Sequence, residues 1–186
     1  MSSTLRFTGE QRVDITQHAA MATVGHVRPS RWSWRLALGA VLDGAMEPSG
    51  QTHEIGPGVV GSISVARMWA VRTWFVSGSL GMSASRTTTG EAGMATARAH
   101  LTALDARAGV VAGRTFGIVS PYVLARAFGG PVWWRLDGAD VSGSDTHHYQ
   151  LGAGTSLATA SGLSFTLDLA LLGERGASLG VALELQ

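Results

Sequence analysis

Few residues of this chain have the types and spacing that metal binding or catalysis requires. His147 and His148 are adjacent, and a pair of imidazoles could hold a metal ion. Neighbouring residues of a β-strand point to opposite faces, however, so these two rings cannot easily share one ion. The chain has no cysteine, which excludes thiolate ligands, disulfides and thiol chemistry. The sequence therefore predicts no metal site.

Two further short motifs could bind a ligand, and neither has the spacing that binding requires. Asp137, Asp140 and Asp145 could hold Ca²⁺, but their spacing is not that of an EF-hand, and aspartate among glycine and serine is ordinary turn chemistry. Gly152 and Gly154 form an isolated GxG within an expected strand rather than at a strand-to-helix turn. We expect no cofactor, and the sequence does not favour an enzyme.

The elements that carry these residues are predicted to be β-strands. Large apolar residues alternate with small or polar residues in segments 32–43, 163–171 and 178–185, which is the period of a strand with two different faces. The length fits a single domain, residues 1–186. The pattern predicts ten strands, at about 3–9, 17–27, 31–45, 58–70, 73–86, 94–112, 118–128, 146–158, 163–173 and 177–186.

Eight strands is the alternative, because the first segment is short and residues 10–16 carry no strong turn signal. The connections between the expected strands alternate between short and long. Arg28 to Ser30 and Ala70 to Arg72 are short, whereas 46–57 and 129–145 are long. Short turns at one end and long loops at the other are typical of membrane β-barrels.

Alternation alone does not separate a soluble barrel from a membrane barrel, so the composition of the polar face decides. The chain has no lysine, and all 14 of its basic residues are arginines. Small residues such as Ser62, Ser64 and Ala66 fill the polar face, which suits the inside of a narrow closed sheet. We expect an all-β fold, a closed antiparallel up-and-down transmembrane β-barrel. A soluble lipocalin-like or avidin-like barrel stays open, since base composition can also remove lysine.

The closing hairpin, residues 162–169 and 177–185, resembles the last two strands of small Gram-negative outer-membrane β-barrels. Segments 120–126 and 149–154 resemble strand starts of the same family. The resemblance implies a bacterial outer-membrane, porin-like architecture whose partners are membrane lipid or lipopolysaccharide, with other envelope proteins as further candidates. Family members usually end in an aromatic residue, whereas this chain ends Leu185-Gln186.

Export and charge bear on location and partners. The first residues, Met1 to Arg6, contain no apolar segment of a signal peptide, so we expect this sequence to be a mature form with a replacement methionine. A net charge of +1 and the lack of a basic run give no reason to expect a nucleic-acid partner.

Two sets of residues follow from the expected barrel. Aromatic residues at the membrane interfaces would be Trp32, Trp34, Trp69, Trp74 and Tyr122 at one end and Trp133 and Trp134 at the other. Charged and polar residues inside would be Arg35, Asp43, Arg98, His100, Asp105, Arg107, Arg126, His148, Gln150, Asp168 and Glu184.

Charges of both signs in a narrow interior should pair, because an unpaired buried ion is costly. We therefore expect an interior plugged by side chains and a structural or adhesive role, or a place in an envelope complex. A narrow solute channel is the first alternative. A rim-active enzyme on lipid or peptide is the second, with His53, Glu54, Glu91, Asp145 and His147 as rim residues that match no triad spacing.

Overall fold

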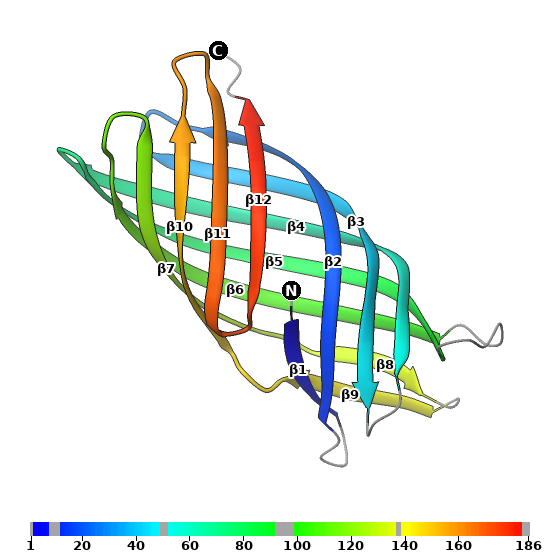
Figure 1. The fold of residues 1–186 in the computed structure, drawn as a ribbon. Coiled ribbons are helices and arrows are strands. Elements are labelled where there is room, and N and C mark those ends of the chain that lie inside the picture. The colour runs from blue at the N-terminus through cyan, green and yellow to red at the C-terminus, as the bar shows by residue number, and fades with distance from the viewer. Residues whose placement is uncertain (1, 8–11, 49–51, 92–98, 137–138, 184–186) are drawn as a thin grey trace.

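A computed structural model describes residues 2–7, 12–48, 52–91, 99–136 and 139–183, which form strands joined by turns (Figure 1). All neighbouring strands are antiparallel, so the predicted all-β antiparallel fold is confirmed. No part of the described chain forms a helix long and apolar enough to cross a membrane. The strands are β1 (Ser2–Phe7), β2 (Arg12–Val27), β3 (Trp32–Pro48), β4 (His53–Val71), β5 (Trp74–Glu91), β6 (Ala99–Arg114), β7 (Val119–Gly129), β8 (Val132–Leu136), β9 (Ala139–Asp145), β10 (Tyr149–Ala158), β11 (Leu163–Gly173) and β12 (Gly176–Leu183).

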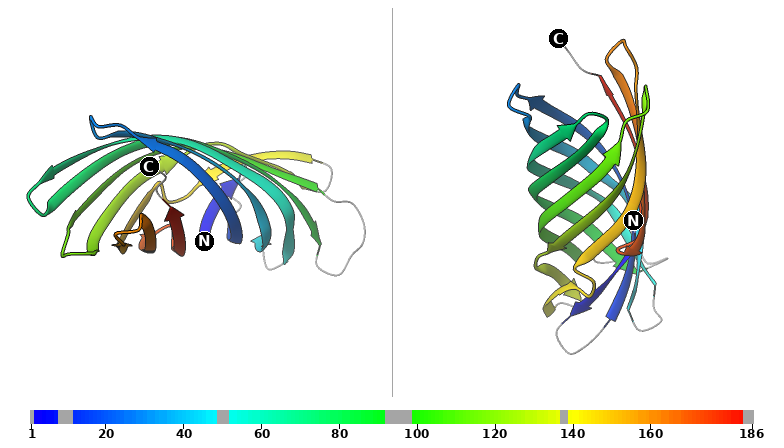
Figure 2. Two further views of the ribbon diagram at one scale, coloured as in Figure 1. Left: turned by 90° about the horizontal axis from the view of Figure 1, so that it is seen from above. Right: turned by 90° about the vertical axis from the view of Figure 1, so that its left-hand side faces the viewer.

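One sheet contains all twelve strands, in the order β12-β11-β10-β7-β6-β5-β4-β3-β2-β1-β9-β8. A further pairing of β6 with β8 closes eight of them, β1 to β6 with β8 and β9, into a ring. Strand β6 forks: Leu101–Ala103 pair with β8, and Ala106–Gly113 pair with β7. From β7 the sheet continues through β10 and β11 to β12, which curve around the front of the molecule (Figures 1 and 2).

The β8–β9 hairpin replaces most of the long loop expected at 129–145. Strand β8 pairs with β6, and β9 pairs with β1 through Leu5, Arg6 and Phe7. The physical reason is burial, because Val132 and Trp134 alternate along β8 and are 4 % and 2 % exposed. Burying these large apolar side chains stabilises the packing of the hairpin on the sheet. The glycine, serine and aspartate residues of this segment had suggested a loop instead.

An apolar core fills the inside of the eight-strand ring near this hairpin. Trp134 is its largest member, packing against Phe7 and the edge of the His53 ring and donating a 2.9 Å hydrogen bond to Thr89. Trp134 was expected at the membrane interface, and the structure instead places it in the core. Its neighbour Trp133 is exposed on the other face of β8. The core consists of Leu5, Phe7, Val13, Ile15, Val41, Met46, Ile55, Leu101, Val132 and Trp134.

Short turns join the strands at the end opposite this core (upper left in Figure 1). The turn between β4 and β5 has only two residues, Arg72 and Thr73. Arg72 has φ 55° and Gly117, in the turn between β6 and β7, has φ 61°. Positive φ suits the tight reversal of a hairpin and favours glycine, so these turns fix the strand ends by backbone geometry.

Candidate functional site

Polar side chains from β6, β7, β10 and β11 meet on the inner face of the sheet. They alternate with exposed apolar residues, as a strand with two different faces requires. We call them the inner polar network, which consists of Asp105, Arg107, Tyr122, Arg126, Gln150, Asp168 and, in the turn after β11, Glu174.

Arg107 lies at one end of this network, between two carboxylates. Its Nε donates to Asp105 Oδ2 at 3.2 Å, and its Nη2 lies 3.6 Å from Glu174 Oε2. Its guanidinium also stacks 4.9 Å above the ring of Phe128, which is the residue directly opposite on β7. One arginine therefore balances charge from two carboxylates, which a delocalised cation with several donors can do.

Arg126 lies in the other half of the network and binds a second carboxylate. Its Nη1 donates to Gln150 Oε1 at 3.0 Å, and its Nη2 lies 3.6 Å from Asp168 Oδ2. Gln150 continues the chain of contacts by donating to the backbone oxygen of Glu174 at 3.4 Å. The two arginines are thus linked through Gln150 and the turn that holds Glu174.

Tyr122 reaches Asp168 across a glycine. Tyr122, Gly154 and Asp168 are direct neighbours on β7, β10 and β11, and the Tyr122 hydroxyl donates to Asp168. A Cβ on Gly154 would lie 2.5 Å from the Tyr122 ring and 2.6 Å from the Asp168 carboxylate. Gly154 therefore leaves the space that the Tyr122 side chain needs to reach Asp168. Tyr122 was expected at an interface and instead is half-buried.

Gly154→Ala is expected to lower the free energy of unfolding by about 1–3 kcal/mol, because the new methyl group must displace the Tyr122 ring or the carboxylate. Denaturant unfolding in detergent, followed by tryptophan fluorescence, measures the change. Gly180→Ala is the matched control, since a Cβ there meets nothing closer than Thr166 at 3.9 Å. Equal losses in the two variants would show that the contact over Gly154 contributes nothing.

Glu174 is the most buried acid of the network, with 2 % of its surface exposed. Burial raises the pKa of Glu174 to about 7; the Arg107 guanidinium opposes this shift, and the nearby Asp145 and Asp105 carboxylates add to it. Glu174 Oε2 has no hydrogen-bond donor within the described part of the chain. The inner polar network therefore holds one proton more tightly than an unfolded chain does.

Raising the pH from about 4.5 to 7 is expected to lower stability through Glu174. Over this range the unfolded chain releases the proton while the folded protein keeps it, so the free energy of unfolding falls by an amount on the order of 2–3 kcal/mol. Below and above that range this group contributes no slope. Denaturant unfolding at pH 4.5 and pH 7.5 tests this, and Glu174→Gln should remove the part of the loss that Glu174 causes. An unchanged pH dependence in that variant would contradict the assignment.

This arrangement brings opposite charges together on the inner face of the sheet. Two arginines face three carboxylates, and the tyrosine donates to one of them. Within the described ranges no group of three His, Cys, Asp or Glu side chains is placed to hold a metal ion. The network can brace the strands from inside, and protonation of Glu174 would leave its charges balanced.

Other residues expected inside the barrel lie outside this network. Arg35 is exposed, and its register with Ser64, Gly81 and Arg107 places it on the inner face. His100 and His148 are exposed. Asp43 is 71 % exposed and pairs with His18 at 2.6 Å, because Leu42 forms a bulge in β3 opposite His18 and Ala19 and shifts the alternation by one residue. Arg98 and Glu184 lie outside the described residues.

Sequence reasoning did not identify Glu174 as part of the site, since it lies in a turn between Gly173 and Arg175. The sequence feature that could have indicated this turn is Gly173. In the structure it has φ 78°, and its backbone lies close to the Tyr149 carbonyl. The alternation of side chains along a strand does not predict the direction of a side chain in a turn.

The outer face of the sheet carries a broad apolar surface, and exposed charges such as Asp14 and the His18–Asp43 pair lie toward the end away from the short turns. Large aliphatic residues project from strands that are far apart in the sequence, such as Leu38 on β3, Leu80 on β5 and Leu179 on β12, with 62–77 % of each residue exposed. Continuous apolar surface on this scale marks an interaction surface. Further exposed members are Leu36, Val59, Ile63, Met82, Val110, Val123, Leu167, Leu169, Val181 and Leu183.

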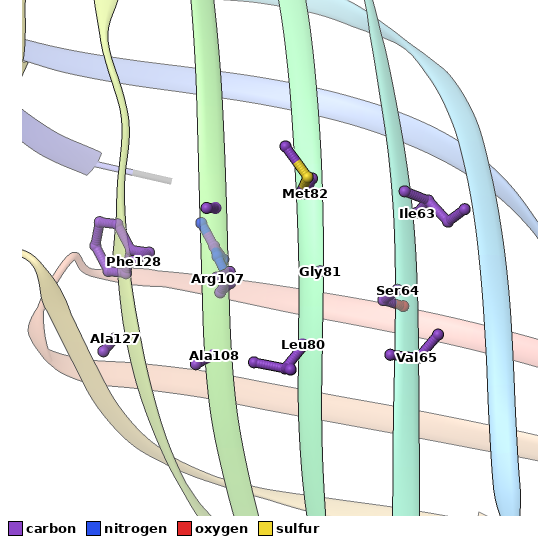
Figure 3. Close-up of a pocket in the computed structure, with 11 residues that line it drawn as sticks. Ile63, Ser64, Val65, Leu80, Gly81, Met82, Arg107, Ala108, Ala127 and Phe128 are labelled. Atoms are coloured by element: carbon purple, nitrogen blue, oxygen red, sulfur yellow. The ribbon is translucent and has the colours of Figure 1, made fainter.

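A shallow groove of about 580 Å³ crosses this outer face over β4 to β7 (Figure 3). Alanines, among them Ala108 and Ala127, leave it open between the larger Ile63, Leu80 and Met82. A second groove, of about 690 Å³, shares Leu80, Ala108 and Ala127 with the first and extends it toward the short-turn end. We treat the two as one apolar surface groove and call it the outer groove.

Aromatic and basic residues mark the short-turn end of the outer groove. The Arg67 guanidinium lies between the rings of Trp32 and Trp69, at 5.5 and 5.4 Å from their centroids. Arg114 stacks in the same way on Trp74 and on Phe116, at 5.4 and 4.8 Å. No carboxylate within the described ranges pairs with Arg67 or Arg114. Arg114 Nε also donates a hydrogen bond to Thr73 Oγ1 at 3.2 Å.

Comparison with known proteins adds no relative: the chain matches no protein-family profile, no curated protein and no solved structure.

Proposed function

We propose that this protein is an integral β-barrel of a bacterial outer membrane, which contacts lipid with its outer face and has an interior filled by side chains. The observation that carries the proposal is the exposure of large apolar residues on the outside of a sheet that has the inner polar network on its opposite face. In water, this pattern would leave an extensive apolar surface uncovered. In a bilayer the same surface is solvated by acyl chains, and backbone groups that pair between neighbouring strands do not need water.

The residues at the short-turn end support a defined position in the bilayer. Trp32, Trp69 and Trp74 are exposed there, where amphipathic rings favour the headgroup layer. Arg67 and Arg114 lie among them, and no carboxylate of the described residues pairs with either, so lipid phosphates at that level would complement their charge. The outer groove leads from this level toward the middle of the sheet and suits an acyl chain.

The interior supports a structural role rather than a conducting one. Arg107 and Arg126 are already bound to carboxylates, and the apolar core fills the ring below them. A narrow barrel has little room beyond its side chains, whereas open channels need about 16–18 strands. We therefore favour a structural, adhesive or envelope-complex role over solute transport.

Site-directed spin labels in lipid vesicles test the proposal. Labels on Leu167 and Leu183 should collide with oxygen, which concentrates in lipid, far more than with a water-soluble nickel complex. A label on Thr166, the inward neighbour of Leu167, is the matched control and should show less preference for oxygen. Water-accessible labels at both leucines, together with solubility of the protein in plain buffer, would overturn the membrane assignment.

A further inference from the structure

Two strand edges face each other across an unpaired seam. Above β1, strand β2 pairs only with β3, and β12 pairs only with β11 (Figures 1 and 2). All residues from His18 to Val27 are exposed, and so are all residues from Ala177 to Leu183. Strands that are paired on both sides, such as β6, β7 and β11, alternate over most of their length between exposed and more buried side chains. The long exposed runs on β2 and β12 accompany their unpaired edges.

Strand β1 lies at the lower end of the seam and contacts both edges. Ser2 is opposite Thr16 of β2 in an antiparallel pair. Ser2 also exchanges two backbone hydrogen bonds with Arg175, at 2.8 and 3.0 Å, directly before β12. At this level one strand therefore joins β2 to β12, and it runs antiparallel to both.

The register that β1 sets is consistent along the seam. Ser2 is opposite Thr16 of β2 and opposite Arg175. Ala22 lies six residues after Thr16, and Val181 lies six residues after Arg175. If β1 were extended upward, Ala22 and Val181 would therefore lie on either side of the same residue of that strand. Ala22 pairs with Leu38 and Val181 with Phe165, and both partners belong to the apolar outer face. Ala22 and Val181 therefore both point to the outer face of the sheet at that position.

We propose that the seam binds one extended polypeptide strand, supplied by another chain, that continues the line of β1 antiparallel to β2 and β12. Backbone groups of both edges would pair with it, which is the mode of β-strand addition. The strand would be about eight residues long, with apolar side chains beside Ala22 and Val181 and small ones beside Met21 and Gly180. This inference goes beyond the proposed function, because it rests on backbone edges.

A partner strand is the favoured occupant because every strand of the described chain already has its place in the sheet. With one strand added, β1 to β7 and β10 to β12 would form a continuous closed sheet. Closure would remove both free edges, which are otherwise templates for aggregation.

Cysteine cross-linking tests the inference, since the chain has no cysteine of its own. Single variants Ala22→Cys and Val181→Cys would be mixed in detergent with a synthetic peptide of alternating valine and serine that carries one central cysteine on its valine face. Both variants should form a mixed disulfide with the peptide. Met21→Cys, which faces inward, is the matched control, and a scrambled peptide of the same composition tests the need for alternation.

The double variant Ala22→Cys/Val181→Cys tests the open seam without any peptide. If one strand fits between the edges, the two positions are two strand spacings apart, about 9–10 Å, which is too far for a disulfide. Peptide addition should slow hydrogen exchange at residues 18–27 and 177–183 at least tenfold. A disulfide forming in the double variant, equal cross-linking by the scrambled peptide, or dimers cross-linked through Val181→Cys would overturn the proposal.

Discussion

Replacing Trp134 by alanine is expected to lower the free energy of unfolding by about 3–5 kcal/mol, the range found for truncating a buried tryptophan. Trp134 is 2 % exposed and contacts Phe7, His53 and Thr89, which lie on three other strands. Its loss leaves a cavity inside the eight-strand ring and frees the β8–β9 hairpin. Reversible unfolding in detergent, followed by far-UV circular dichroism, measures the effect.

Trp133→Ala is the matched control, because Trp133 is the adjacent residue, 44 % exposed on the opposite face. We expect a loss of no more than about 1 kcal/mol there. If both variants lose the same stability, the hairpin does not pack as described. If Trp133→Ala is the more damaging change, Trp133 and not Trp134 lies in the core.

Replacing Leu167 by arginine is expected to cost about 2–4 kcal/mol of folding free energy in lipid vesicles, because the charge would enter the hydrocarbon layer. Leu167 lies on the outer face, 40 % exposed, between Thr155 of β10 and Leu179 of β12. Urea titration of the protein folded in vesicles measures the change. In detergent micelles, which deform around a charge, we expect a smaller loss.

Thr166→Arg provides the control one residue away on the inner face. Thr166 lies opposite Gly180 and Ser156, whose small side chains leave room for the longer arginine. This variant should fold in vesicles with a loss of about 1 kcal/mol or less. Equal losses at the two positions would mean that the outer face of β11 does not contact lipid.

Local alternation is what made the strands predictable. In β11, Phe165, Leu167 and Leu169 are exposed and Asp168 faces inward, in agreement with the two-residue period of the sequence. Asp105, Arg107, Arg126 and Asp168 could be selected as inward-facing polar residues by the same rule. They lie in regular segments, where the side-chain period depends only on the chain itself.

Bulges and long-range pairings set the limits of that rule. Asp43 follows an extra residue in β3, and a shift of one residue moves a side chain to the other face. The sequence near Asp43 does not predict the bulge, because the bulge depends on the register between β2 and β3. The β8–β9 hairpin likewise depends on β1 and β6, which are distant in the sequence.

The sequence by itself determined the all-β antiparallel fold and the contrast between an apolar and a small or polar face, because both follow from a two-residue period within each strand. Only the tertiary structure decided which partners meet: Trp134 with the core, Glu174 with Arg107, Tyr122 with Asp168 across Gly154, and the unpaired edges of β2 and β12. These depend on register between strands, which is set by contacts between residues far apart in the chain.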